Sequence, residues 1–219
     1  MRGTLGASLV FCLGVIVAAA ACTGDDGGEG DGLGEAEQEV IVGSFAARFD
    51  ETVPGGGVVA QGASMSGRED AATNASAPIT IAGIPAGATV HRALLYWTIS
   101  GGNDTTATIN AAAVTGVLLG TAGDTCWGVN NTAYRADVTA NVTGNGVYTI
   151  AGLPSSTVAT AADTDGVALV VTYRNNTSGV RRRVMVRDGA ISSSGTAEIV
   201  SDTFTGVAAP IASAGRFHL

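Results

Sequence analysis

The sequence predicts an all-β protein, an antiparallel β-sandwich of jelly-roll type, and three observations support this fold class. Short runs rich in Val, Ile and Thr alternate with turn residues from residue 39 onward. No stretch of about ten or more residues in that part combines a helical apolar period with helix caps. Only 14% of the 219 residues are charged and 32 are glycines, which is typical of a β-rich surface module rather than a helical enzyme.

The expected strands follow one another along residues 39–219 with short polar connections between them. They cover residues 39–49, 79–82, 89–99, 105–110, 114–119, 133–138, 146–151, 167–174, 181–187 and 196–204. Residues 52–77 are expected to form a long loop with one short strand near 57–61. Residues 84–88, with a proline followed by a glycine, predict a turn.

The strand at 89–99 is the best defined of these elements. Both of its faces are apolar over residues 93–97, which predicts a central strand that is covered on both sides. Tyr96 and Trp97 point to opposite faces because side chains alternate along a strand. We expect one of the two in the core and the other along a surface groove.

Glycine- and asparagine-rich turns predict three hairpins, and with them the antiparallel class. Residues 100–104 lead from the strand at 89–99 into the strand at 105–110. A tight turn at 143–146 leads into the strand at 146–151, where Asn-Gly favours the positive φ of hairpin turns. Residues 175–179 join the strand at 167–174 to the strand at 181–187.

The N-terminus has the composition of an export signal. Arg2 precedes an uncharged apolar run, which ends in four alanines before Cys22. This stretch resembles a bacterial lipoprotein signal, although Ala19 stands where that family usually has leucine. The resemblance implies that residues 1–21 are a signal peptide and that Cys22 is acylated and becomes the new N-terminus. Ordinary secretion and an uncleaved anchor are the alternatives. Thr23 favours the outer membrane or the cell surface, because it replaces the aspartate associated with inner-membrane retention.

Residues 22–38 are expected to be the lipidated cysteine and a disordered, acidic, Gly-rich stalk that acts as a flexible tether. Seven of the 19 acidic residues lie between residues 23 and 39, without a basic residue. From residue 40 onward, 12 acids face 10 arginines, so the domain at 39–219 is close to neutral. This balance does not indicate a nucleic-acid partner. All 11 basic residues are arginines, which excludes chemistry that needs a lysine amine.

The sequence contains no recognisable catalytic motif, so we expect a protein that is not an enzyme and has no catalytic residues. The chain has two histidines, of which His91 is interpreted as a strand residue rather than a general base. No Cys/His spacing is typical of zinc. Cys126 is interpreted as a buried thiol, with an intermolecular disulfide and a missing partner as alternatives.

Three groups of side chains are candidates for binding. Asp163 and Asp165, followed by a glycine, resemble the start of a calcium loop, and a plain polar turn is the alternative. Three arginines on one strand face are candidates for an acidic polysaccharide, unless they form a solvated face that pairs with Asp188, Asp163 or Asp165. The arginines are Arg181, Arg183 and Arg187. The candidate stacking platforms for sugars are Trp97, Trp127, Tyr96 and Tyr134.

An ordered series of segments resembles an uncharacterised family of bacterial cell-surface β-sandwich domains. The segments are residues 93–97 (ALLYW), 126–128 (CWG), 134–139 (YRADVT), 144–149 (GNGVYT), 165–171 (DGVALVV) and 187–189 (RDG). The resemblance covers roughly residues 89–210 and implies a fold and a location, but no activity. Members of the family continue with another strand or two after this point, so we expect a sandwich that is truncated at its C-terminus.

The leading functional hypothesis is a lipid-anchored bacterial cell-envelope protein. Its non-catalytic β-sandwich would serve surface binding, adhesion or structure. Its partners would be the lipid bilayer, through acylated Cys22, and an envelope polysaccharide or a surface protein. The first alternative is a carbohydrate-binding module that uses exposed aromatic rings, and the second is a hydrolase of unknown class. No cofactor is expected apart from the Ca²⁺ candidate.

Overall fold

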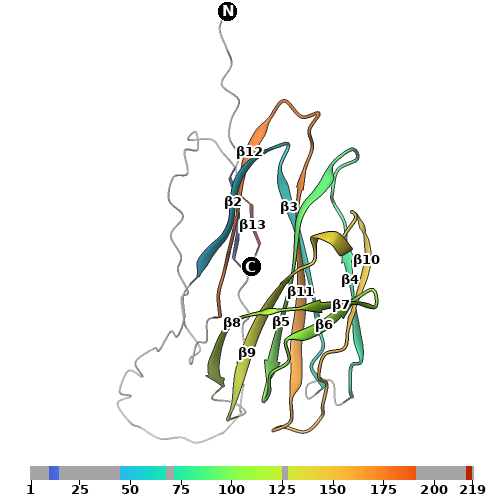
Figure 1. Cartoon of the computed structure of the whole chain (residues 1–219), viewed down its shortest axis with the longest axis vertical. Coiled ribbons are helices and arrows are strands. Elements are labelled where there is room, and N and C mark those ends of the chain that lie inside the picture. Colours follow the sequence, from blue (N-terminus) through green and yellow to red (C-terminus); the bar gives the residue numbers. More distant parts are fainter. Residues whose placement is uncertain (1–9, 15–44, 68–71, 125–127, 191–215, 219) are drawn as a thin grey trace, which may run out of the picture.

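A computed structural model describes residues 10–14, 45–67, 72–124, 128–190 and 216–218, and this part of the chain is all-β (Figure 1). The one 3-10 helix is η1 (Thr139–Asn141). The described ranges contain no helix that is long and apolar enough to cross a membrane. The strands are β1 (Val10–Gly14), β2 (Ala46–Pro54), β3 (Gly57–Ser64), β4 (Ser76–Ile81), β5 (Thr89–Ser100), β6 (Thr106–Ile109), β7 (Ala112–Thr115), β8 (Val117–Asp124), β9 (Val129–Asp137), β10 (Gly146–Ala151), β11 (Asp163–Arg174), β12 (Arg181–Asp188) and β13 (Arg216–His218).

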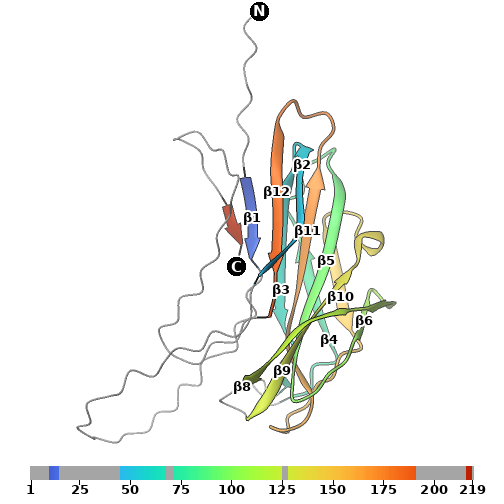
Figure 2. The same ribbon diagram turned by 60° about the vertical axis from the view of Figure 1, so that its left-hand side comes forward.

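The strands form three sheets, stacked as layers (Figures 1 and 2). The first sheet has the order β13-β1-β12-β2, the middle sheet β3-β11-β5-β9-β8, and the third sheet β4-β10-β6-β7. All pairs are antiparallel except those of β1, which runs parallel to β12 and to β13. The predicted antiparallel β-sandwich is confirmed, with three layers of strands. β1 lies within residues 1–21, the segment predicted to be a signal peptide.

Two hydrophobic clusters hold the layers together, and β5 contributes to both. Between the middle and third sheets, Trp97 and Leu95 of β5 pack with residues such as Ile150. Between the middle and first sheets, Leu94 and Tyr96 pack with residues of β2 and β12. The prediction of a central strand covered on both sides is therefore confirmed. Burial of this much apolar side chain is the main force that holds the three layers together.

The three predicted hairpins are wrong, because each turn carries the chain into another sheet. The chain passes from β5 in the middle sheet to β6 in the third, and from β9 in the middle sheet to β10 in the third. It also passes from β11 in the middle sheet to β12 in the first. The paired neighbours in sequence are β6 with β7 and β8 with β9. A turn residue fixes a reversal of the chain, but it does not fix which sheet the next strand joins.

The connection from β11 to β12 is bonded to a second crossing, the one from β2 to β3. The amide of Gly55 donates to the carbonyl of Val180 at 2.6 Å, and the amide of Asn175 donates to the carbonyl of Pro54 at 2.9 Å. Gly55 has a φ of 51°, a conformation that glycine adopts at little cost. These two bonds fix the corner at which the first and middle sheets meet.

Several predicted boundaries also need correction. Residues 52–77 were expected to be mainly loop, but they hold the end of β2, all of β3 and the first residues of β4. The strand expected at 114–119 is two strands, β7 and β8, which separate at Gly116. The strand expected at 196–204, the tether at 22–38, Cys22, Cys126 and Trp127 lie outside the described residues.

Gly116 is predicted to be required for the packing of Trp97. A Cβ atom at Gly116 would lie 2.4 Å from the ring of Trp97, which is buried and cannot retreat, whereas a Cβ at Gly123 on β8 would meet nothing within 4 Å. We expect Gly116→Ala to lower the free energy of unfolding by about 2 kcal/mol through overpacking. Urea denaturation followed by circular dichroism measures this loss. Gly123→Ala is the matched control, and equal effects of the two substitutions would contradict the prediction.

Candidate functional site: an arginine-lined groove between two sheets

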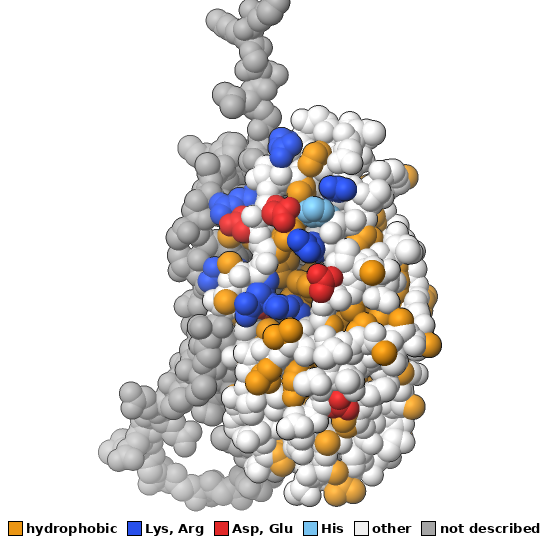
Figure 3. Space-filling model, viewed as in Figure 1, with side chains coloured by type: hydrophobic (Ala, Val, Ile, Leu, Met, Phe, Trp, Pro, Cys, Tyr) orange, Lys and Arg blue, Asp and Glu red, His pale blue; other side chains and the backbone are white. Residues whose placement is uncertain are grey.

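A cavity of about 390 Å³ lies between the first and middle sheets. Figure 3 shows arginine and acidic side chains gathered along a crevice with hydrophobic side chains between them. Charged side chains, one threonine and five apolar side chains line the cavity. They are Arg48, Phe49, Asp50, Glu51, Arg92, Leu94, Val117, Arg135, Asp137, Val170, Thr172 and Val186. The cavity is the candidate functional site.

The alternation of side chains along β5 and β9 determines which residues of the middle sheet line the groove. Leu94 of β5 faces the first sheet, and its register partner on β9 is Asp137. Two residues further along, Tyr96 of β5 is opposite Arg135 of β9. Since side chains of directly opposed residues share one face of a sheet, Arg135 and Asp137 also face the first sheet. Arg92 lies on this face too, two residues before Leu94.

β-bulges bring further side chains to this side. Near the start of β2 the strand carries one residue more than β12, and that extra residue is Arg48. A second bulge makes His91 the extra residue of β5 opposite β11, and a third makes Leu119 the extra residue of β8 opposite β9. A bulge interrupts the alternation of side chains and re-aims the extra residue. Arg48, His91 and Leu119 all contact residues of the layer between the first and middle sheets.

Asp188 is the buried centre of the charged groups. It is fully buried, and its Oδ2 accepts a hydrogen bond from Nη1 of Arg135 at 2.6 Å and another from the hydroxyl of Tyr96 at 3.0 Å. Its Oδ1 accepts a hydrogen bond from Nε of Arg48. The side chains of Arg48 and Arg135 are 37% and 17% exposed. One carboxylate therefore joins β2, β9 and β12 through two guanidinium groups.

The environment of Tyr96 reflects the same centre. Burial raises the pKa of the Tyr96 hydroxyl well above its usual value of 10, and the negative charge of Asp188 raises it further. The hydroxyl is thus held as a proton donor to Asp188. The expectation that one of Tyr96 and Trp97 lies in the core is confirmed, but the expectation that the other lines a surface groove is wrong, because both side chains are buried and neither lines the cavity.

Two looser contacts lie around the cavity. Nη1 of Arg92 is 3.6 Å from Oδ2 of Asp137, and both side chains are about half exposed. Nε2 of His91 is 3.0 Å from Oε2 of Glu51. The ring of His91 also makes an edge contact with Phe49, with centroids 5.5 Å apart. His91 lies in β5 with the carboxylate of Glu51 as its neighbour, and its interpretation as a strand residue rather than a general base stays a prediction.

The aromatic residues expected to offer stacking platforms do not do so. Trp97 is only 1% exposed, Tyr134 stacks on it with centroids 5.6 Å apart, and Tyr96 is buried on the opposite face of the sheet. Nε1 of Trp97 donates to the carbonyl of Asp104. Burial raises the pKa of the Tyr134 hydroxyl. The interpretation of these three as exposed ligand contacts is therefore wrong, because their rings form the core between sheets. Trp127 lies outside the described residues.

The three arginines of β12 share the outer face of the first sheet, and their partners differ from those expected. Arg183 binds Asp50 with two hydrogen bonds of 2.6 Å. Arg181 donates to the carbonyl of Thr52 at 2.8 Å, and Arg187 donates to that of Phe45 at 3.2 Å. The hydrogen bond from Arg183 lowers the pKa of the Asp50 carboxyl. The expected pairing with Asp188, Asp163 or Asp165 is wrong, because these carboxylates accept hydrogen bonds from other groups.

Asp163 and Asp165 accept hydrogen bonds from different partners. Asp163 is buried, and it accepts hydrogen bonds from the amides of Gly67 and Ser156 and from the hydroxyl of Ser66. Asp165 is the extra residue of a bulge between β11 and β5 and accepts a hydrogen bond from the hydroxyl of Ser100. Asp163 thus joins the segment that follows β3 to the loop between β10 and β11. In the described part of the chain, no three metal-ligating side chains gather, and calcium binding by Asp163 and Asp165 stays a prediction.

Comparison of the chain with protein-family models, curated proteins and solved structures finds no match. The resemblance to bacterial cell-surface domains therefore stays a prediction, and the function has to be inferred from the geometry of the groove.

Sequence reasoning did not single out the residues that make this groove. Arg48, Arg92 and Arg135 each stand alone as a base within a strand, and the sequence predicts for Asp188 only a possible pairing with the arginines of its own strand. The available signal was a charged residue at a position that alternation assigns to the buried face, as for Asp188 after Val184 and Val186. Such a residue predicts a buried partner of opposite charge.

Asp188 is predicted to contribute far more to stability than Asp50. Asp188→Asn leaves two guanidinium groups without their buried carboxylate, which should lower the free energy of unfolding by about 3 kcal/mol. Asp50→Asn removes a solvent-exposed pair and should cost less than about 1 kcal/mol. Urea denaturation of the two variants measures both values. A loss for Asp188→Asn no larger than that for Asp50→Asn would show that the buried centre is not structural.

The ion pair between Arg183 and Asp50 predicts that the free energy of unfolding falls as the pH is lowered. Because the pKa of Asp50 is lower in the folded chain than in the unfolded one, its contribution is fully present above about pH 5 and is lost as the pH falls through the folded value. Urea midpoints of the unaltered protein and of Asp50→Asn should therefore differ at pH 6 and converge towards pH 3. A difference that stays constant over this range would contradict the prediction.

Proposed function

We propose that the protein is an exported bacterial envelope protein, anchored by lipid at Cys22, whose β-sandwich is a non-catalytic binding module. The observation that carries the proposal is the groove between the first and middle sheets, where three arginines surround an apolar floor. Concave sites with an apolar lining and a few convergent polar groups are the usual form of ligand-binding sites.

The charged groups of the groove favour binding over catalysis. Asp188 is held by Arg48, Arg135 and Tyr96, and His91 lies against Glu51. A general base needs a side chain that can reach a substrate proton, whereas Asp188 is enclosed. Guanidinium groups with a fixed orientation are better suited to recognise an anion.

The N-terminal sequence supports the location. An apolar run of export-signal length ends at Cys22, and a stretch with seven acids and no base follows it. Each buried methylene of an acyl chain adds about 0.8 kcal/mol of membrane affinity, and several chains on one residue give stable anchoring. The groove would then be presented at a membrane surface by a polar tether.

The alternatives receive less support. A carbohydrate-binding module that stacks sugars on exposed rings is disfavoured by the burial of Trp97, Tyr96 and Tyr134. A hydrolase would need a nucleophile and a base in contact, and the hydrogen-bonded neighbour of His91 in the described part of the chain is the carboxylate of Glu51. Neither alternative explains three arginines around one groove.

Acylation at Cys22 is the first test. We expect the full chain, expressed in a bacterium with its own leader, to enter the membrane fraction and to incorporate an alkyne-labelled fatty acid. Its intact mass should correspond to a chain that begins at Cys22 and carries acyl groups. Cys22→Ser should lose the label and the membrane association, whereas the matched control Cys12→Ser should keep both. A label that survives in Cys22→Ser, or an unmodified mass, would refute lipid anchoring.

A further inference from the structure

We infer that the groove between the first and middle sheets binds an organic anion in which a single carboxylate is attached to a small apolar body. This inference rests on the proposed function, since it names the ligand class of the same binding module. It follows from four features of the groove: its hydrogen-bond donors, its charge balance, its floor and its size.

The first feature is a set of guanidinium N–H donors that make no hydrogen bond within the described residues. Each guanidinium group carries five N–H donors. Within the described ranges, Arg48 and Arg135 each make one hydrogen bond, both to Asp188, and Arg92 approaches only Asp137, at 3.6 Å. Both terminal nitrogens of Arg48 and Arg92, and Nη2 of Arg135, are therefore available to an acceptor that enters the groove. A carboxylate matches the forked geometry of guanidinium donors.

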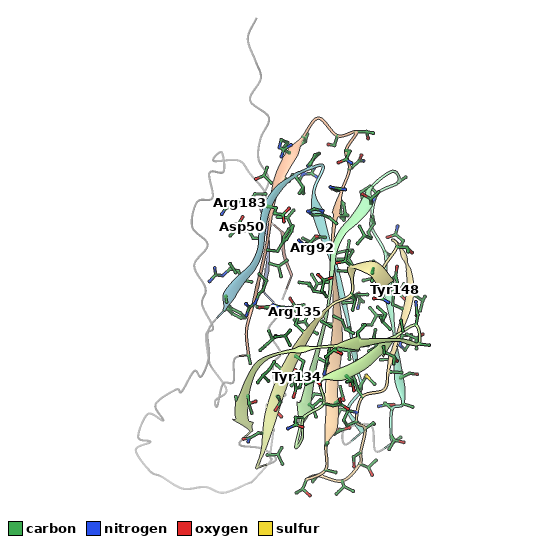
Figure 4. The ribbon with its side chains drawn as sticks, in the orientation of Figure 1. Asp50, Arg92, Tyr134, Arg135, Tyr148 and Arg183 are labelled. Carbon is green, nitrogen blue, oxygen red and sulfur yellow. The ribbon has the colours of Figure 1, made fainter. Side chains whose placement is uncertain are left out.

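The second feature is the local charge. Asp50 lines the groove, but its carboxylate accepts two hydrogen bonds from Arg183. Figure 4 shows this pair on the far side of β2 from Arg92 and Arg135. Glu51 lies beside His91. Glu51, Asp137 and Asp188 then stand against the three arginines of the groove. The groove therefore has no surplus of positive charge for a dianion, and a single negative charge adds the smallest excess.

The third feature is the apolar floor. The side chains of Phe49, Leu94, Val170 and Val186 line the groove and belong to the cluster between the two sheets, and Val117 on β8 is 61% exposed at its wall. The ring of Phe49 is occupied by its contact with His91. A sugar would find no exposed ring to stack on, whereas an apolar body would cover aliphatic surface and gain from its removal from water.

The fourth feature is the size of the space. About 390 Å³ falls at the small end of the range of ligand pockets, roughly 300–1,000 Å³. A monocarboxylate with a six-membered apolar ring or a short alkyl chain fits such a volume. A folded polymer does not fit, although a chain end could reach in. These features together define the ligand class as small, apolar and singly negative.

The experiment uses the mature protein, extracted from membranes in non-ionic detergent, with 4-fluorobenzoate as the probe at pH 7. Fluorine NMR relaxation of the probe reports binding, and protein-free detergent gives the blank. We expect saturable binding in the millimolar range or tighter. The neutral analogue 4-fluorobenzyl alcohol should bind at least about tenfold more weakly, because it cannot accept charge-assisted hydrogen bonds. Galacturonate should not compete at equal concentration.

Two variants and a matched control locate the site. Arg92→Gln removes a half-exposed arginine that does not hold Asp188, and it should weaken binding at least about fivefold. Val117→Glu places a negative charge on the exposed wall and should abolish binding. Arg181→Gln removes the same charge from the outer face of β12 and should change affinity less than about twofold. Circular dichroism confirms that each variant is folded.

Several outcomes would overturn the inference. These are an absence of saturation, equal binding of the alcohol, equal losses in Arg92→Gln and Arg181→Gln, or effective competition by galacturonate. The last outcome would assign the groove to acidic saccharides. If Cys22 is acylated while the probe does not bind, the ligand class fails and the anchored module stands. If the probe binds but Cys22 is unmodified, the anchoring fails and the binding site stands.

Discussion

The middle sheet must be covered on both faces, and the rest of the structure depends on this constraint. β5 and β11 carry apolar side chains on both sides, so one additional layer would leave half of them in water. The third sheet covers one face over β5 and β11. The first sheet covers the other face only as far as its edge strand β2, whereas the middle sheet continues past β5 to β9 and β8. The groove lies at this difference in width.

The charged residues of β9 lie where the first sheet no longer covers the middle sheet. Arg135 and Asp137 face the first sheet from just beyond β2, and Arg135 reaches inward to Asp188 on β12. A buried carboxylate is costly to desolvate and contributes little net stability even when it is paired. It does, however, penalise every arrangement that leaves it unpaired. We therefore interpret Asp188 as the group that fixes how the edge of the first sheet sits over β9, which in turn fixes the shape of the groove.

The sequence predicted the fold class, the central strand and most strand positions, because those depend on local alternation and apolar runs. Residues 89–99, for example, were predicted within one residue of β5. It failed where the structure depends on long-range choices. The turns at 100–104, 143–146 and 175–179 reverse the chain, but they lead into different sheets. Three bulges shift Arg48, His91 and Leu119 out of regular alternation. A single extra residue in a strand leaves no signature in a period-two pattern, so the site could not be assembled from the sequence.

The distribution of charge along the chain bears on which anions the groove would bind. Residues 23–39 carry seven acids and no base, and the remainder carries 12 acids against 10 arginines, so the groove lies in a molecule of negative net charge. Beyond the screening length of about 8 Å at physiological salt, this charge gives an anion no attraction. Because 12 acids and 10 arginines leave the domain close to neutral, a polyanion would gain contacts only at the groove and none along the rest of its length. A small monocarboxylate would gain the contacts of the three arginines and those of the apolar floor as well, so these residues favour a small ligand over an acidic polymer.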